Sequence, residues 1–153
     1  MFEVPEEVIL KALNKAIDVL IRKYDELGMR ATGDWAQGLE ARPGHNGGEI
    51  WGLPYTEQLV QGRAPGNRPP IAPLERWVQA KFRMSGRQAT SMAFAVANKI
   101  AKEGTTWHQQ GGSDLLEVLD DQEVVDTFYS AIGSYLTIQV TEELTRTLKE
   151  LAA

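Results

Sequence analysis

The chain has 153 residues, of which 42% are hydrophobic and 24% are charged, as expected of a globular domain rather than a disordered chain. It contains no cysteine, which excludes disulfides, thiolate metal sites and cysteine nucleophiles. The formal net charge of −5 argues against a general nucleic-acid binder, since such proteins usually carry a net positive charge.

The first seven residues carry three acidic side chains where a secretory signal peptide needs a basic leader. Nowhere do about 18 apolar residues run together, as a membrane-spanning helix requires. We therefore expect the protein to stay in the cytoplasm where it is made, without a membrane partner.

A long helix is predicted within residues 1–28. Pro5 suits the first helical position, and Gly28 suits a left-handed cap at the end. Between them, apolar side chains recur at alternating spacings of three and four: Leu10, Leu13, Ile17, Leu20, Tyr24 and Leu27. This stripe must leave water, because burial stabilises each such side chain by about 1.5–3 kcal/mol. It packs either in the core or, as a seam of almost three heptads, against another subunit.

Residues 29–54 are predicted to form a glycine-rich β-hairpin. Six glycines fall in this segment, and each would destabilise a helix by about 1 kcal/mol. We expect strands at about 29–41 and 49–53, joined by the turn-forming residues 42–48. Trp51 on this hairpin is a candidate apolar anchor for a partner, because tryptophan is enriched at interface hot spots.

A short helix should follow from Pro54, and a stiff loop is predicted at residues 62–70. Pro65 and Gly66 suit the central positions of a type II turn, because proline presets φ and glycine accepts a positive φ. The next prolines, Pro69 and Pro70, continue the loop as an extended, polyproline-like course.

Arg63 and Arg68 project from this stiff loop. Guanidinium groups on a rigid turn bind phosphate, including the DNA backbone, or the carboxylates of a partner protein. Alternatively, the loop is a solvated connector whose prolines only set up the next helix. The residues alone leave these readings open.

Three longer helices are expected beyond the loop, and a short turn of helix at Ser113. The first begins at Pro73, and the second runs from about 88 to 103, where small inward residues indicate close packing against a neighbouring helix. The third is a long amphipathic helix near the end of the chain. Its apolar side chains recur at threes and fours: Val125, Phe128, Ile132, Leu136, Val140, Leu144 and Leu148.

These elements predict an α+β fold, mostly helical, in a single domain over residues 1–153. Its expected parts are a long N-terminal helix (1–28), a small antiparallel β-hairpin (29–54), central helices with the Gly-Arg-x-Pro-Gly loop (55–105), and C-terminal helices that include one long helix (113–151).

No catalytic, metal or cofactor site is predicted. The two histidines, His45 and His108, lie in separate glycine-flanked loops without a carboxylate at metal-ligand spacing. Asp120 and Asp121 are explained by capping of the next helix and by its dipole. Because the common hydrolase, metalloprotease and dinucleotide-binding motifs are also absent, we expect a protein that is not an enzyme. An active site of unrecognised type is a third, less favoured alternative.

The middle third of the chain holds two characteristic runs. In the first, a helix leads through Gly62-Arg63-Ala64-Pro65-Gly66 and Pro69-Pro70 into a helix that carries Trp77 and Lys81. The second is the alanine-rich run 93–105, which ends in Gly-Thr. Together they resemble a signature of the proteins that join head to tail in tailed bacteriophages, the neck or tail-completion proteins.

The resemblance implies an α+β virion structural protein that forms a ring of identical subunits in the neck, between portal and tail, after synthesis in the bacterial host cytoplasm. Its implied partners are further copies of the chain, the portal and other neck or tail proteins, with no cofactor. We predict protein-interaction roles for Arg63, Arg68, Pro65, Gly66 and Trp51. The alternative is a protein that contacts nucleic acid through Arg63 and Arg68 without reading its sequence.

Overall fold

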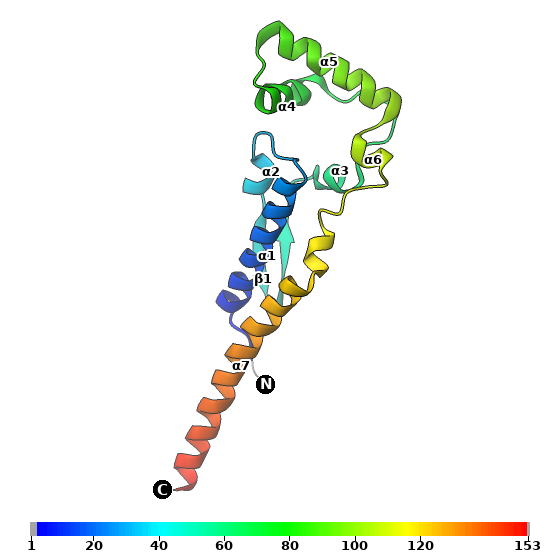
Figure 1. Ribbon diagram of the computed structural model, residues 1–153. Coiled ribbons are helices and arrows are strands. Elements are labelled where there is room, and N and C mark those ends of the chain that lie inside the picture. Colours follow the sequence, from blue (N-terminus) through cyan, green and yellow to red (C-terminus); the bar gives the residue numbers. More distant parts are fainter. Residues whose placement is uncertain (1–2, 153) are drawn as a thin grey trace. The chain divides into compact units, whose positions relative to one another are not determined.

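The computed structural model describes residues 3–152 (Figure 1). The helices and strands, in chain order, are α1 (Glu6–Glu26), α2 (Asp34–Gln37), β1 (Glu40–Gly44), β2 (Gly47–Trp51), α3 (Thr56–Gln61), α4 (Ile71–Phe82), α5 (Gly86–Glu103), α6 (Thr106–Gln109), the 3-10 helix η1 (Glu117–Asp120) and α7 (Gln122–Leu151). The predicted α+β class is confirmed, because long helices stand at both ends of the chain and a two-stranded antiparallel sheet lies between them in sequence.

The chain divides into two compact units. The described parts of the first unit are residues 3–20, 40–51 and 117–152, and the second unit consists of residues 21–39 and 52–116. The single-domain organisation expected for residues 1–153 stays a prediction, and positions 1, 2 and 153 lie outside the described residues.

The core of the first unit is the apolar stripe of α1. Of the predicted seam in this unit, Leu13, Ile17 and Leu20 are each exposed by 8% or less, whereas Leu10 is 37% exposed and the unpredicted Ile9 is buried in its place. Strand β2 approaches this helix closely at Gly48, where an added Cβ would lie 2.6 Å from the Leu13 side chain. The added Cβ would also lie 2.9 Å from the backbone oxygen of Arg42, which cannot rotate away, so glycine is favoured at this position for steric reasons.

The strand predicted at 29–41 is wrong over most of its length. Asp34–Gln37 form helix α2 instead, and β1 begins only at Glu40 and pairs with β2 from Glu40↔Trp51 to Gly44↔Gly47. The connection is also shorter than expected, since His45 and Asn46 alone close the hairpin.

The cause of the error lies in the second unit, where Trp35 on α2 is only 1% exposed. Its ring lies 4.7 Å from that of Tyr24, and its indole Nε1 donates a hydrogen bond to Thr56 Oγ1 at 2.9 Å. Burial of this large side chain selects a helical turn, which overrides the weak local preference of a glycine-rich segment.

The predicted end of α1 at Gly28 is confirmed. Gly28 has a φ of 68°, and the hydrogen bonds Met29 N→Tyr24 O and Gly28 N→Asp25 O, at 3.2 and 3.0 Å, form the pair that defines a Schellman motif. The glycine adopts the left-handed conformation without the steric cost that a Cβ would bring.

Helices α4 and α5 pack side by side in the second unit, as their small residues predicted (Figure 1). Ala89 and Ala93 on α5 are fully buried against Val78 of α4. Helix α4 begins at Ile71, two residues before the expected Pro73. The third helical position tolerates proline, because its N–H has no acceptor within the helix.

Helix α7 runs unbroken for 30 residues, and the predicted long C-terminal helix is confirmed. Its last three leucines, Leu144, Leu148 and Leu151, are increasingly exposed, at 59%, 65% and 80%. Among the helices of residues 3–152, none is both long enough and apolar enough to span a membrane.

Candidate functional site

The loop at residues 62–70, in the second unit, is held by hydrogen bonds to a distant part of the chain. Arg63 N donates to Thr105 Oγ1 at 2.8 Å, and Thr105 N donates back to Arg63 O at 2.9 Å. Gly66 N donates to Ala101 O at 2.9 Å, which ties the loop to the last turn of α5. The loop is therefore fastened at two points to the Gly-Thr end of α5.

Thr105 is a residue whose role we did not predict. Its side-chain oxygen accepts from Arg63 N and also from His108 N at 3.4 Å, so it caps α6 while it holds the loop. The two runs that carry the family resemblance, 62–70 and 93–105, thus contact each other through backbone groups. A threonine directly after the glycine that ends a helix was the available signal.

Arg63 and Arg68 differ in their surroundings. Arg63 is partly buried and its Nη2 donates to Asn67 O at 3.4 Å, whereas Arg68 is exposed. Neither forms an ion pair with a carboxylate of residues 3–152. The buried Pro69 anchors the chain directly after Arg68. The loop therefore presents two guanidinium groups on a backbone that the rest of the unit holds in place.

The predicted type II turn at Pro65 and Gly66 is wrong in detail. Gly66 has a positive φ, as expected, but its value of 144° is far from the about +80° of that turn. The Gly66 N–H points to Ala101 O, so the long-range hydrogen bond sets the conformation.

The Pro65→Ala/Gly66→Ala double variant should impair assembly more than stability. An added Cβ at Gly66 meets nothing within 4 Å, so only the backbone conformation resists the change, at a cost of about 1 kcal/mol. That corresponds to a loss of about 2–4 °C in melting temperature. Gly111→Ala is the matched control, because Gly111 has a φ of 84° and equally open space. If the two variants assembled equally, as measured by light scattering, the loop would be only a connector without a role in assembly.

Trp51 is the predicted interaction residue that belongs to the first unit, at the end of β2. It is 50% exposed, and the Arg42 guanidinium lies 4.0 Å from its ring centroid. Its Nε1 donates to Glu49 Oε2 at 2.8 Å. Arg42 also donates to Glu40 at 3.0 Å, and this hydrogen bond lowers the pKa of the Glu40 carboxyl. The indole is thus held by charged neighbours with half of its surface still in water.

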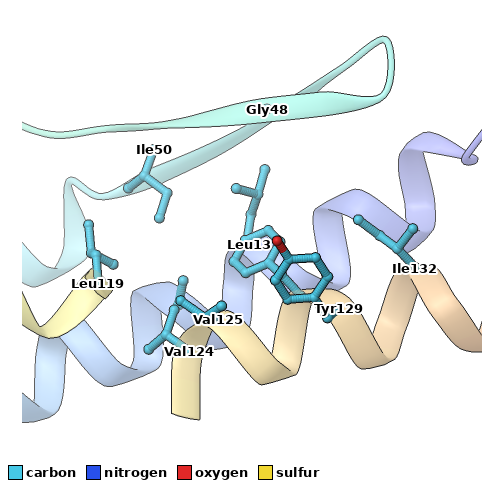
Figure 2. Close-up of a pocket in the computed structure, with 10 residues that line it drawn as sticks. Leu13, Gly48, Ile50, Leu119, Val124, Val125, Tyr129 and Ile132 are labelled. Atoms are coloured by element: carbon cyan, nitrogen blue, oxygen red, sulfur yellow. The ribbon is translucent and has the colours of Figure 1, made fainter. Parts of the chain in front are cut away.

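An apolar groove in the first unit was not predicted. It has a volume of about 520 Å³, and Leu13 of α1, Gly48 and Ile50 of β2, and Tyr129 and Ile132 of α7 are among the residues that line it. Figure 2 shows the strand that carries Gly48 and Ile50 facing the side chains of α7. Of the residues that line this "apolar groove", Leu13 belongs to one predicted helix stripe and Val125, Phe128 and Ile132 belong to another, whereas Gly48 and Ile50 belong to the predicted hairpin. Their meeting depends on tertiary packing.

The candidate catalytic groups lie in separate surroundings. His45 is in the hairpin turn of the first unit, and His108 is on α6 of the second unit. Asp121 stands at the N-terminal cap of α7, one residue after the expected Asp120. Within residues 3–152, no three His, Cys, Asp or Glu side chains gather as metal ligands.

Compared with known proteins, the chain matches no protein-family model, no curated protein and no solved structure.

Proposed function

We propose that the chain is a structural protein of a tailed bacteriophage, which forms a ring of identical subunits in the neck between portal and tail and is not an enzyme. The observation that carries this proposal is the loop 62–70, whose arginines have fixed backbone positions and no carboxylate partner in residues 3–152. Donors fixed in advance lose less entropy on binding, and guanidinium favours planar acceptors such as carboxylates.

The distribution of charge supports association of copies with one another. The second unit has eleven Lys and Arg against seven Asp and Glu, a net charge of +4, whereas the first unit has five against fourteen, a net charge of −9. A chain with one basic and one acidic unit is electrostatically complementary to its own copies. Contacts between different faces of identical subunits close into rings when the rotation between subunits permits.

The carboxylates that we propose for Arg63 and Arg68 come from the first unit of a neighbouring copy or from a partner protein. Glu3, Glu6 and Glu7 are exposed at the start of α1 and are candidates. Trp51 supplies an apolar contact in the same first unit.

A second candidate function is contact with DNA, which the net charge of +4 on the second unit also favours. In that case Arg63 and Arg68 would bind phosphates as DNA passes through the ring. Binding to phosphates weakens steeply as salt rises, because condensed counterions are released on binding.

Fluorescence anisotropy with a labelled DNA duplex at about 50 and 200 mM salt separates the two functions. We expect the Arg63→Glu/Arg68→Glu variant and the wild type to bind the duplex equally weakly. Arg76→Glu/Arg87→Glu is the matched control, since it changes the net charge of the same unit by the same amount. Salt-sensitive DNA binding that is lost in the loop variant and kept in the control would reverse the ranking.

A further inference from the structure

Helix α7 carries two apolar faces that point in different directions. The faces are made of Val124, Phe128 and Ile132, and of Val140, Leu144 and Leu148. Each residue of the second face follows its counterpart on the first by 16 positions, which at 3.6 residues per turn is a rotation of roughly 160°. One straight helix therefore cannot bury both faces against the same surface.

Within residues 3–152, the first face is the one that packs against other parts of the chain. Val124 is 5% exposed, and Phe128 and Ile132 line the apolar groove. On the second face, Val140 and Leu144 are 42% and 59% exposed, and Leu148 is 65% exposed.

The second face itself holds no charged side chain, although Glu143, three positions after Val140, borders it. The charged side chains of this half of α7 are otherwise turned away from the face. These are Glu142, Arg146, Lys149 and Glu150. Arg146 forms ion pairs with Glu143 at 2.5 Å and with Glu150 at 3.9 Å, so these three charges pair with one another within the helix. An apolar partner is the one that this face fits.

The apolar groove has matching chemistry. Its described lining residues are all uncharged, and Tyr129 on its α7 side is 73% exposed. The wall that α7 supplies from Val124 to Ile132 is about 12 Å long, and the second face, which continues from Val140 past Leu148 to Leu151, is about 16 Å long and can therefore span it.

A chain cannot fill its own groove with its own second face. The groove wall and the second face lie on one continuous helix, α7 (Figure 1). Val140 stands about 12 Å further along the axis than Ile132, since eight residues separate them. A second copy, however, brings one groove and one helix end of the same composition. Each copy has one groove and one second face, so a closed ring contains equal numbers of the two.

We propose that the second face of α7 of one copy docks in the apolar groove of the next copy. This contact joins two different surfaces, and such head-to-tail contacts build closed rings or open filaments. The rival arrangement pairs two α7 ends with each other. It is less favoured, because the coiled-coil seam at the end of α7 would be shorter than two heptads. Leu144, Leu148 and Leu151 keep the spacing of such a seam, but the position before them is Thr141.

This inference rests on the proposed function only in that copies associate, and it can be tested by disulfide cross-linking because the chain has no cysteine. In the Tyr129→Cys/Leu144→Cys variant, mild oxidation is expected to yield a ladder of covalent dimers, trimers and larger species. A disulfide needs Cα atoms within about 7 Å, so the ladder reports the docked geometry.

The matched control is the Tyr129→Cys/Glu142→Cys variant. Position 142 is two residues from 144 and is therefore turned by roughly 200° to the charged side of the helix. We expect at least ten times less ladder from it. An equal ladder from this control, or dimers from the single variant Leu144→Cys as abundant as the ladder, would overturn the proposal.

A mixing experiment gives a second readout. Leu144→Lys/Leu148→Lys removes the docking face, and Tyr129→Lys blocks the groove; all three positions are more than half exposed, so the fold should persist. Each variant alone should sediment as a monomer under conditions in which the wild type associates. An equimolar mixture should form dimers and nothing larger, because one intact groove meets one intact face.

Failure of the docking contact can be told apart from failure of the proposed function. The contact joins apolar surfaces of two units that each carry a net charge of −9, so cross-linking should be undiminished or stronger at high salt, where repulsion is screened. If the lysine variants formed the same rings as the wild type, only the docking contact would be rejected. Absence of association, both alone and with the portal protein, would reject both.

Discussion

Replacing Trp35 by alanine is expected to lower the free energy of unfolding by about 3–5 kcal/mol, the range for loss of a buried tryptophan. The side chain is 1% exposed and its ring lies 4.7 Å from that of Tyr24. The change also removes the 2.9 Å hydrogen bond from the indole to Thr56 Oγ1. A loss of this size is a large share of the about 5–15 kcal/mol by which domains are stable. Urea unfolding followed by circular dichroism measures it.

Trp51→Ala is the matched control for this prediction. It is the same substitution at a position that is 50% exposed, where the main loss is the stacking of Arg42 on the ring. Such an exposed cation–π contact contributes about 0.5–1 kcal/mol. We expect this variant to keep its stability within about 1 kcal/mol and to assemble less well. Equal destabilisation by both substitutions would contradict the assignment of Trp35 to the core and of Trp51 to an interface.

Reversing the charge of Arg63 and Arg68 together should weaken assembly by about 100-fold or more, since breaking a buried, hydrogen-bonded charge pair costs about 2–5 kcal/mol. Glutamate would also repel the carboxylates that we propose as partners. The fold should be unaffected, because Arg63 N and O and Gly66 N fasten the loop to α5, and the change removes only the 3.4 Å hydrogen bond from Arg63 Nη2 to Asn67 O within the loop. Sedimentation velocity across a concentration series gives the change in affinity.

The control for the charge reversal is again Arg76→Glu/Arg87→Glu. It should weaken assembly by less than about tenfold, because it acts only through the net charge of the second unit. If the control impaired assembly as strongly as the loop variant, net charge would explain the effect. If the loop variant assembled like the wild type, Arg63 and Arg68 would have no role in an interface.

Several elements of the fold could be predicted from local sequence. The three-four spacing of α1 and its glycine cap led to a helix whose end at Gly28 closes as expected. Buried alanines on α5 likewise pack against α4. In these cases the residues that set the structure are a few positions apart, so periodicity and capping chemistry are sufficient.

Long-range contacts account for the errors. Helix α2 replaces a predicted strand because Trp35 packs on Tyr24, eleven positions away, and bonds to Thr56. The conformation of Gly66 depends on Ala101, which is farther still along the chain. No local pattern contains such information, since it arises only when distant segments pack.

The same limit applied to the candidate site. Arg63 and Arg68 were identified from a stiff, proline-rich loop, but the role of Thr105 in holding that loop was not. The apolar groove joins residues of α1, β2 and α7, and nothing in any one of these segments marks it. The apolar repeat of α7 was predicted as one stripe, although its drift around the helix divides it into two faces.

The central claim is that this chain builds a ring in a phage neck. It is tested most directly by sedimentation velocity and negative-stain electron microscopy of the chain, alone and mixed with the portal protein proposed as its partner. We predict closed rings of identical copies seated on the portal, and association that appears only in its presence agrees with this prediction. A chain that stays strictly monomeric both alone and beside the portal would contradict the claim.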